Sequence, residues 1–229
     1  MIKNNKRSGN PQKRKTAPVK RSTAESTVRS PGTAERVHWD GAALLGPVPA
    51  VFVTCADGEK SNVFTVAWTG IICSKPAKTY ISVRPERYSH GIISKSGEFT
   101  INLASSALVR ALDRCGVHSG RDHDKFSENS LDTVPGNLNS CPQLAASPLS
   151  LECKVTDVLH LGSHDMFLAD IAGCEVRSDL ITDDGKLDMS SAGLLAYNHG
   201  EYFALGKKIG QFGFSVKKRK KPEKRSKVK

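Results

Sequence analysis

None of the six cysteines forms a C-x-x-C pair, so the chain lacks the spacing typical of zinc ribbons and of thioredoxin-like redox centres. No stretch approaches about 18 consecutive apolar residues, so we expect no transmembrane helix. The basic beginning, MIKNNKRSGN, is not followed by an apolar segment, which argues against a secretory signal. These absences favour a cytoplasmic protein with reduced thiols.

Positive charge is concentrated at the two ends of the sequence. The 229 residues carry a net charge of +11. Residues 1–36 and residues 217–229 each carry about +8, which leaves about −5 for residues 37–216. Segments so basic and so poor in apolar residues cannot offset their ordering entropy by burial. We therefore predict two disordered tails around one folded domain, 37–216.

Most signals inside that domain are typical of β-strands. VPAVFVTCAD and SNVFTVAW flank the turn dipeptide Asp57-Gly58, which predicts a hairpin over 49–68. LSLECKVTDVLHL and DMFLADIAGCEVR flank Gly162-Ser163 and predict a longer hairpin, while KTYISVR and GEFTINL are single strands. Helical patterns are few: SHGIISKSG, with Ser89 as N-cap and Gly97 as stop, and SALVRALDRCG. The sequence predicts a mainly β fold, an antiparallel barrel with a few peripheral helices.

Two polar stretches are candidate binding segments, and each has an ordinary structural interpretation. NVFTVAWTG places amide, hydroxyl and indole groups on and just after a strand, although a core Trp68 with surface threonines is the commoner arrangement. SVRPERYSHG places Arg84, Arg87 and Ser89 before a helix, where backbone N–H groups can bind phosphate. A simple N-cap with solvated arginines is an equal alternative for this second stretch.

Two further stretches carry histidines. CGVHSGRDHDKF, residues 115–126, crowds charged groups between glycines; a zinc site with Cys141 does not fit the usual spacing, and a Cys–His nucleophile is conceivable. HLGSHDMF places His164 at a hairpin tip, where a histidine is usually surface decoration. Each stretch alone is weak evidence for a binding site, and the stronger evidence is the order and spacing of the stretches along the chain.

Taken together, these segments resemble the flavin reductase-like family of FMN-binding split barrels, and its flavoredoxin branch most closely. The resemblance covers about residues 44–206 and depends on VFVTCADGEKSNVFTVAWTGIICSKPAKTYISVRPERYSHGII, GEFTINL, CGVHSGRDHDKF, LECKV and GSHDMFLADI. It implies a Greek-key split barrel that binds FMN non-covalently at the interface of a homodimer. The chain departs from the family pattern at KPAK, where many relatives have a second proline. The resemblance does not explain the basic tails.

The resemblance also assigns roles to individual residues. Asn62 and Trp68 are implied to be flavin-site residues, with the backbone of Val66 and Ala67 along the isoalloxazine ring. Ser89 is implied to lie near the ribityl phosphate, with Arg84 or Arg87 as its cationic partner. Lys125 is implied to be a direct flavin ligand, and His164 and Tyr197 to close over the ring system. Asn102 is a weaker assignment. His164 and Lys125 are the implied catalytic residues. A cation such as Lys125 near N1–C2=O of the flavin would stabilise its reduced form, with Asp124 orienting it.

The electron donor is left open by the sequence. No G-x-G-x-x-G fingerprint is present, so NAD(P)H would have to dock transiently over the flavin. The resemblance implies an oxidoreductase, either a reductase of free flavin or ferric substrates or an electron-transfer protein with a small-molecule or protein redox partner. The alternative is a protein whose basic tails bind nucleic acid or another polyanion.

Overall fold

The computed structural model of the protein describes residues 35–216. The chain divides into two units, Met1–Ala42 and Ala43–Lys229, and the fold described below belongs to the second. Residues 35–42 of the first unit form no helix or strand. The predicted tails lie outside the described residues, apart from residues 35 and 36. In the described part of the chain, no helix has the length and apolar character needed to cross a membrane.

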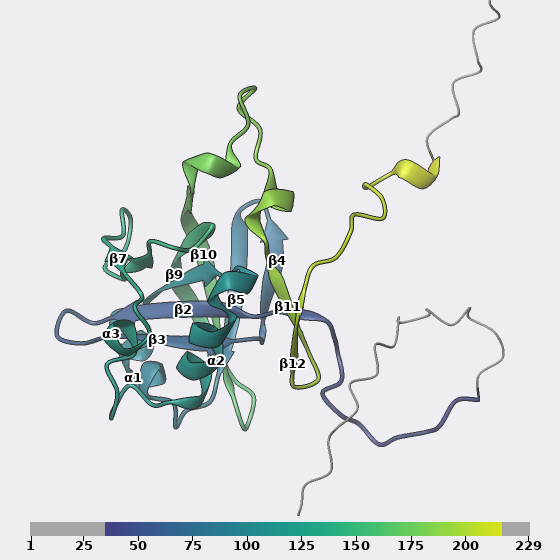
Figure 1. Ribbon diagram of the computed structural model, residues 1–229. Helices are drawn as coiled ribbons and strands as arrows, with labels where there is room; N and C mark the ends of the chain where they lie inside the picture. The colour runs from purple at the N-terminus through teal and green to yellow at the C-terminus, as the bar shows by residue number, and fades with distance from the viewer. Residues whose placement is uncertain (1–34, 217–229) are drawn as a thin grey trace, which may run out of the picture. The chain divides into compact units, whose positions relative to one another are not determined.

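A seven-stranded antiparallel sheet forms the body of the second unit, in the order β3-β2-β6-β9-β10-β5-β4 (Figure 1). Its strands are β2 (Val51–Ala56), β3 (Ser61–Val66), β4 (Thr69–Ser74), β5 (Ala77–Val83), β6 (Glu98–Leu103), β9 (Leu149–His160) and β10 (Asp165–Val176). Both predicted hairpins are confirmed, because β2 pairs with β3 and β9 pairs with β10. Strands that are not consecutive in the sequence also pair, such as β2 with β6 and β5 with β10, so the connections between them cross over other strands.

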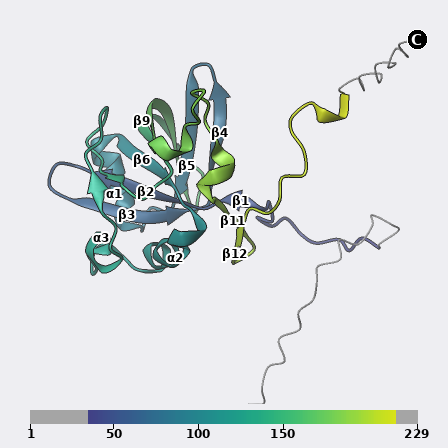
Figure 2. The ribbon, with the colours of Figure 1, turned by 45° about the horizontal axis from the view of Figure 1, so that its top comes forward.

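Smaller elements surround this sheet. They are β1 (Val48–Pro49), β11 (Leu195–Asn198) and β12 (Glu201–Ala204), which form a second sheet; β7 (Thr133–Val134) and β8 (Gln143–Leu144), which form a third; and the helices α1 (Tyr88–Ser96), α2 (Val109–Val117) and α3 (Lys125–Glu128). Single 3₁₀ turns occur at Ser106–Leu108, Ser178–Leu180, Met189–Ala192 and Phe214–Val216. All three α-helices lie beside β3 in two views (Figures 1 and 2).

Burial explains the strand pattern. In β5, Thr79, Ile81 and Val83 are buried while the residues between them are not, as the alternation of KTYISVR predicts. The main core gathers buried side chains of β2, β3, β5, β6, β9, β10 and α1, and a second cluster packs under α2. This arrangement confirms the predicted mainly β, antiparallel split-barrel fold with few helices.

The predicted helix ends need one correction. Gly97 ends α1 in the left-handed conformation, at φ 68°, as expected for a C-terminal glycine. Ser89, however, is not the N-cap: that position belongs to Arg87, and Ser89 lies inside the first turn, buried. The prediction failed because a serine before an apolar run can be an N-cap or a first-turn residue, and here its hydroxyl has a tertiary partner. α2 continues one residue past Gly116, to Val117.

Candidate functional site

Two adjoining cavities open on one side of the barrel. The first has a volume of about 370 Å³ and the second about 650 Å³. They share four lining residues: Phe64, Arg84, Arg87 and Val117. We refer to the first as the ring end and to the second as the anion end, according to their lining, and to both together as the cleft.

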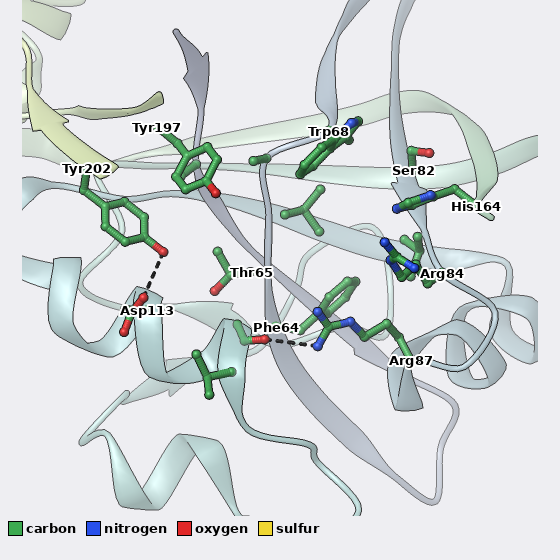
Figure 3. Close-up of a pocket in the computed structure, with 16 residues that line it drawn as sticks. Phe64, Thr65, Trp68, Ser82, Arg84, Arg87, Asp113, His164, Tyr197 and Tyr202 are labelled. Carbon is green, nitrogen blue, oxygen red and sulfur yellow. Dashed lines mark hydrogen bonds between the residues drawn. The ribbon is translucent and has the colours of Figure 1, made fainter. Parts of the chain in front are cut away.

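The ring end is built where β3 stops. Val66, Ala67 and Trp68 line it in succession. Figure 3 shows Trp68 at this wall, and its side chain is half exposed, at 51%. The interpretation of Trp68 as a core residue is therefore wrong. Thr65 contributes to the same wall, and its hydroxyl donates to the backbone carbonyl of Leu112 in α2. Successive side chains of a strand point to opposite faces of the sheet, but because the strand ends here, odd- and even-numbered residues can line the same cavity.

His164 reaches this wall from the turn between β9 and β10. Its ring stacks with the indole of Trp68, with centroids 6.1 Å apart and planes at 25° (Figure 3). Ser163 Oγ lies 2.9 Å from His164 Nδ1, which leaves Nε2 as the nitrogen for a ligand. The turn histidine is thus a lining residue rather than surface decoration.

The hairpin of β11 and β12 forms the opposite wall. Tyr197 and Tyr202 pack edge to face, with centroids 5.5 Å apart. The Tyr202 hydroxyl donates to Asp113 Oδ1 of α2 at 3.3 Å, which ties the hairpin to the helix (Figure 3). Burial, followed by the nearby Asp113 charge, raises the pKa of Tyr202 to about 12, so this hydroxyl keeps its proton at neutral pH.

The anion end is centred on a pair of buried polar side chains. Asn62 Nδ2, from β3, donates to Ser89 Oγ, from α1, at 2.7 Å. Gly120 packs against this pair: a Cβ added there would lie 2.3 Å from Asn62 Oδ1 and 2.8 Å from Tyr88 Cδ1. Gly120 is therefore required for close packing, and its φ is not in the left-handed region.

Positively charged groups surround that pair. Arg84, Arg87 and Arg121 line the cavity with Lys125, while Glu86 is the acidic lining residue, 3.7 Å from Arg84. Arg87 Nη1 donates to the carbonyl of Gly116 at 3.0 Å, which holds the guanidinium between the two cavities. In the described part of the chain, no side chain caps α1, so its N-terminal N–H groups add to the positive potential.

Lys125 is the most unusual cation of the site because it is only 3% exposed. Its Nζ donates to the carbonyls of Cys115 at 3.1 Å and His118 at 3.3 Å. Burial, with a smaller contribution from repulsion by the Arg87 guanidinium, lowers the pKa of Lys125 to about 8. Lys125 lines the anion end and not the ring end.

Two expectations need correction here. Asn102 lines neither cavity: it is fully buried in β6, donates to Thr54 Oγ1 and accepts from Ser150 Oγ and Leu144 N. Its polarity serves the packing of the barrel. Asp124 does not orient Lys125; its carboxylate accepts from Ser127 N and caps α3.

The other chemistries considered for residues 115–126 find no support. Burial raises the pKa of the Cys115 thiol to about 11, so it is a poor nucleophile at neutral pH. Within residues 35–216, no group of three His, Cys, Asp or Glu side chains is arranged to hold a metal ion.

Several lining residues escaped the sequence reasoning. Asp113 and Tyr202 lie 89 positions apart, and only the fold brings them together. Phe64 and Ser82 lie inside the candidate stretches NVFTVAWTG and SVRPERYSHG, but their ordinary strand positions did not single them out. Arg121 stands in the crowded stretch 115–126, where two positive and two negative side chains balance, so local charge did not single it out.

Comparisons with known proteins agree with this architecture. The chain matches the family model of the flavin reductase like domain over residues 46–206. It is similar to the solved flavoredoxin of Desulfovibrio vulgaris (Miyazaki F), with TM-score 0.74 and 28% identity, covering 80% of this chain and 100% of that one. The FMN-binding protein from Thermus thermophilus with bound 1-cyclohex-2-enone has the same fold, with TM-score 0.65, 21% identity and coverage of 80% and 99%.

A curated relative carries a functional name. The NADH:riboflavin 5'-phosphate oxidoreductase of Streptomyces pristinaespiralis is 24% identical over 127 residues, which cover 56% of this chain and 69% of that protein. The match of the family model spans most of the folded region, 46–206. The chain therefore belongs to the flavin reductase-like domain family.

Proposed function

We propose that the chain is a flavin-dependent oxidoreductase that binds FMN non-covalently along the cleft, with the phosphate at the anion end and the isoalloxazine at the ring end. The observation that carries this proposal is the pairing of two cavities of different character, joined through Arg84 and Arg87. FMN has the same division, with a dianionic phosphate at one end and a flat aromatic system at the other.

The donor set of the anion end fits a phosphate. Four cations, a buried serine hydroxyl and an uncapped helix N-terminus converge on one cavity. Arginine supplies fixed forks of N–H donors to phosphate oxygens, and helix N–H groups favour negative charge. Ser89 and Lys125 are both buried, so their geometry is set before any ligand arrives.

At the ring end, the extended backbone of Val66 and Ala67 can run along one edge of a flat ring. Trp68, His164 and Tyr197 can cover it and exclude water. Bound FMN would supply hydride and electron transfer, which protein side chains lack. His164 Nε2 is available to hold or release a proton there. We assign Lys125 to phosphate binding rather than to tuning of the ring, because it lines the other end.

The electron donor is proposed to be NADH or NADPH, docked transiently over the ring. Support comes from the names of relatives: the Streptomyces pristinaespiralis protein is described as an NADH:riboflavin 5'-phosphate oxidoreductase, and a Streptomyces viridifaciens relative as an NADPH-flavin oxidoreductase. A flavoredoxin-like role with a protein partner is supported by the structural similarity to flavoredoxin. The alternative function, polyanion binding through the basic ends, has no support in the comparisons.

We further propose a homodimer. β4 is an edge strand of the large sheet, and its Ile71 and Ile72 are 66% and 49% exposed. An open edge with exposed apolar side chains is the kind of surface that a two-fold partner covers. The half-exposed Trp68 precedes β4 directly, so such a partner would approach the ring end.

The test is direct. The purified protein, reconstituted with flavin if necessary, is expected to be yellow and to release FMN rather than FAD on chromatography. Oxidation of NADH and NADPH is then followed with free flavin, ferric complexes and small electrophilic acceptors. Failure to bind any flavin after reconstitution would overturn the proposal, and release of FAD would overturn the choice of FMN.

A further inference from the structure

A buried carboxylate that lines neither cavity connects segments from both. Asp165 begins β10 and is 6% exposed. Its Oδ2 lies 2.8 Å from His90 Nε2, and its Oδ1 lies 2.8 Å from His160 Nδ1. Each carboxylate oxygen therefore has its own imidazole partner, one from α1 and one from the end of β9.

The position of this carboxylate relates it to the whole cleft. Asp165 directly follows His164 along the chain, and its partner His90 directly follows Ser89. Across the sheet, Asp165 pairs in register with the residue that precedes Arg84. Asp165 therefore adjoins the histidine of the ring end, and its partners on α1 and β5 adjoin the serine of the anion end and an arginine that both ends share.

The two imidazoles differ in how far they are exposed to solvent. The His90 side chain is 17% exposed, and its ring meets Phe167 edge to face with centroids 5.1 Å apart. The His160 side chain is 78% exposed. Hydrogen bonds from His160 and then His90 hold the pKa of Asp165 below its ordinary value, so its carboxylate is ionised at neutral pH. These imidazoles are the titratable groups that face it, from β9 and α1, while β5 presents the apolar Val83.

We propose that Asp165 is a positioning residue that holds the two ends of the cleft in register with each other. Through His90 it fixes the first turn of α1, which presents Ser89 and the helix N-terminus to the anion. Through His160 and its own place at the start of β10, it fixes the turn that carries His164. The identity of the ligand rests on the proposed function, but the coupling itself concerns only the chain.

The first experiment needs no flavin. Hydrogen–deuterium exchange is measured on the full-length flavin-free protein and on its Asp165→Ala and Asp165→Asn variants. Asparagine keeps the shape of aspartate without its charge, so the second variant serves if the alanine variant does not fold. Exchange is expected to rise at both the first turn of α1 and the 160–165 turn, while the core strands β2 and β6 stay unchanged. Asp170→Asn is the matched control: it removes another β10 carboxylate, paired with Lys78, and is expected to change neither segment.

The second experiment reads the two ends through two ligands. FMN and riboflavin differ only in the phosphate, so an effect through α1 weakens FMN binding alone and an effect through His164 weakens both. Asp165→Asn is expected to weaken FMN binding by roughly tenfold or more and riboflavin binding by less. A lower melting temperature with unchanged exchange at either segment, or unchanged affinities, would overturn the inference. A wild-type protein that binds neither flavin would overturn the proposed function, and the exchange result would still decide the role of Asp165.

Discussion

Replacement of Lys125 by methionine is expected to change stability and flavin affinity in opposite directions. A pKa of about 8, against an ordinary value of 10.5, means that the buried ammonium costs roughly 3 kcal/mol. Methionine removes that cost but leaves the carbonyls of Cys115 and His118 without their donor, a loss of roughly 1–3 kcal/mol. The flavin-free variant should therefore be as stable as the wild type, or more stable by up to about 2 kcal/mol.

FMN affinity should fall in the same variant. Loss of one charge-assisted hydrogen bond to the phosphate costs roughly 1.5–3 kcal/mol, or about 10- to 150-fold in the dissociation constant. Urea unfolding of the flavin-free proteins gives the stability, and quenching of flavin fluorescence gives the affinity. Riboflavin, which has no phosphate, should bind both proteins alike. The flavin potential should change little, because Lys125 lines the anion end.

The pH dependence follows from the same lowered pKa. Below pH 8 the folded protein holds the charged ammonium, which both binds phosphate and opposes folding. Between pH 8 and about 10.5 the unfolded chain holds more protons than the folded one, so stability without flavin should rise with pH. FMN affinity should fall over the same range, and Lys125→Met should show neither trend from this group.

The matched control is Lys154→Met, which removes an exposed lysine of β9 that lines neither cavity. It should leave flavin affinity and its pH profile unchanged. A Lys125→Met protein that is less stable but binds FMN with wild-type affinity would refute the reasoning, because Lys125 would then be a structural donor only.

Further outcomes can be checked together. Ser89→Ala should weaken FMN binding by roughly 2- to 15-fold without moving the flavin potential, as measured by titration and by redox equilibration. Gly120→Ala should also weaken FMN binding, because the added Cβ displaces Asn62. Its control is Gly91→Ala, where the added Cβ meets open space inside α1. This control should leave FMN affinity unchanged and raise the free energy of unfolding in urea by roughly 0.5–1 kcal/mol. A protein truncated to residues 37–216 should sediment as a flavin-loaded dimer; a stable loaded monomer would contradict the proposed assembly. The truncated protein should keep turnover with a small acceptor but lose the salt-sensitive retention of the full chain on an anionic matrix; loss of turnover would mean that the ends serve the redox site.

The strands and both long hairpins could be predicted from the sequence because local alternation and turn dipeptides encode them. The cleft could be predicted only in part. Residues near a distinctive local pattern, such as Ser89 after the arginines or His164 at its turn, were found and do line it. Asp113 and Tyr202 were not found, since their contact depends on how the hairpin of β11 and β12 meets α2.

Asn102 shows the reverse error. A polar side chain on a strand can serve a ligand or the interior, and local sequence does not distinguish the two. Here β6 lies between β2 and β9, so the amide is enclosed and bonds to Thr54, Leu144 and Ser150. A buried amide with its hydrogen bonds satisfied stabilises a single packing arrangement and has no capacity left for a cofactor.

The anion end is arranged at a cost to the folded protein, and that cost itself argues for a ligand. Arg87 repels Lys125, and burial opposes the ammonium charge. Arg84 has an exposed partner in Glu86, whereas Lys125 is satisfied by neutral carbonyls. A dianion bound among these groups would remove the repulsion, raise the pKa of Lys125 and gain from donors already held in place. A neutral ligand would gain none of this, which is why we expect the phosphate to contribute most of the discrimination between FMN and riboflavin.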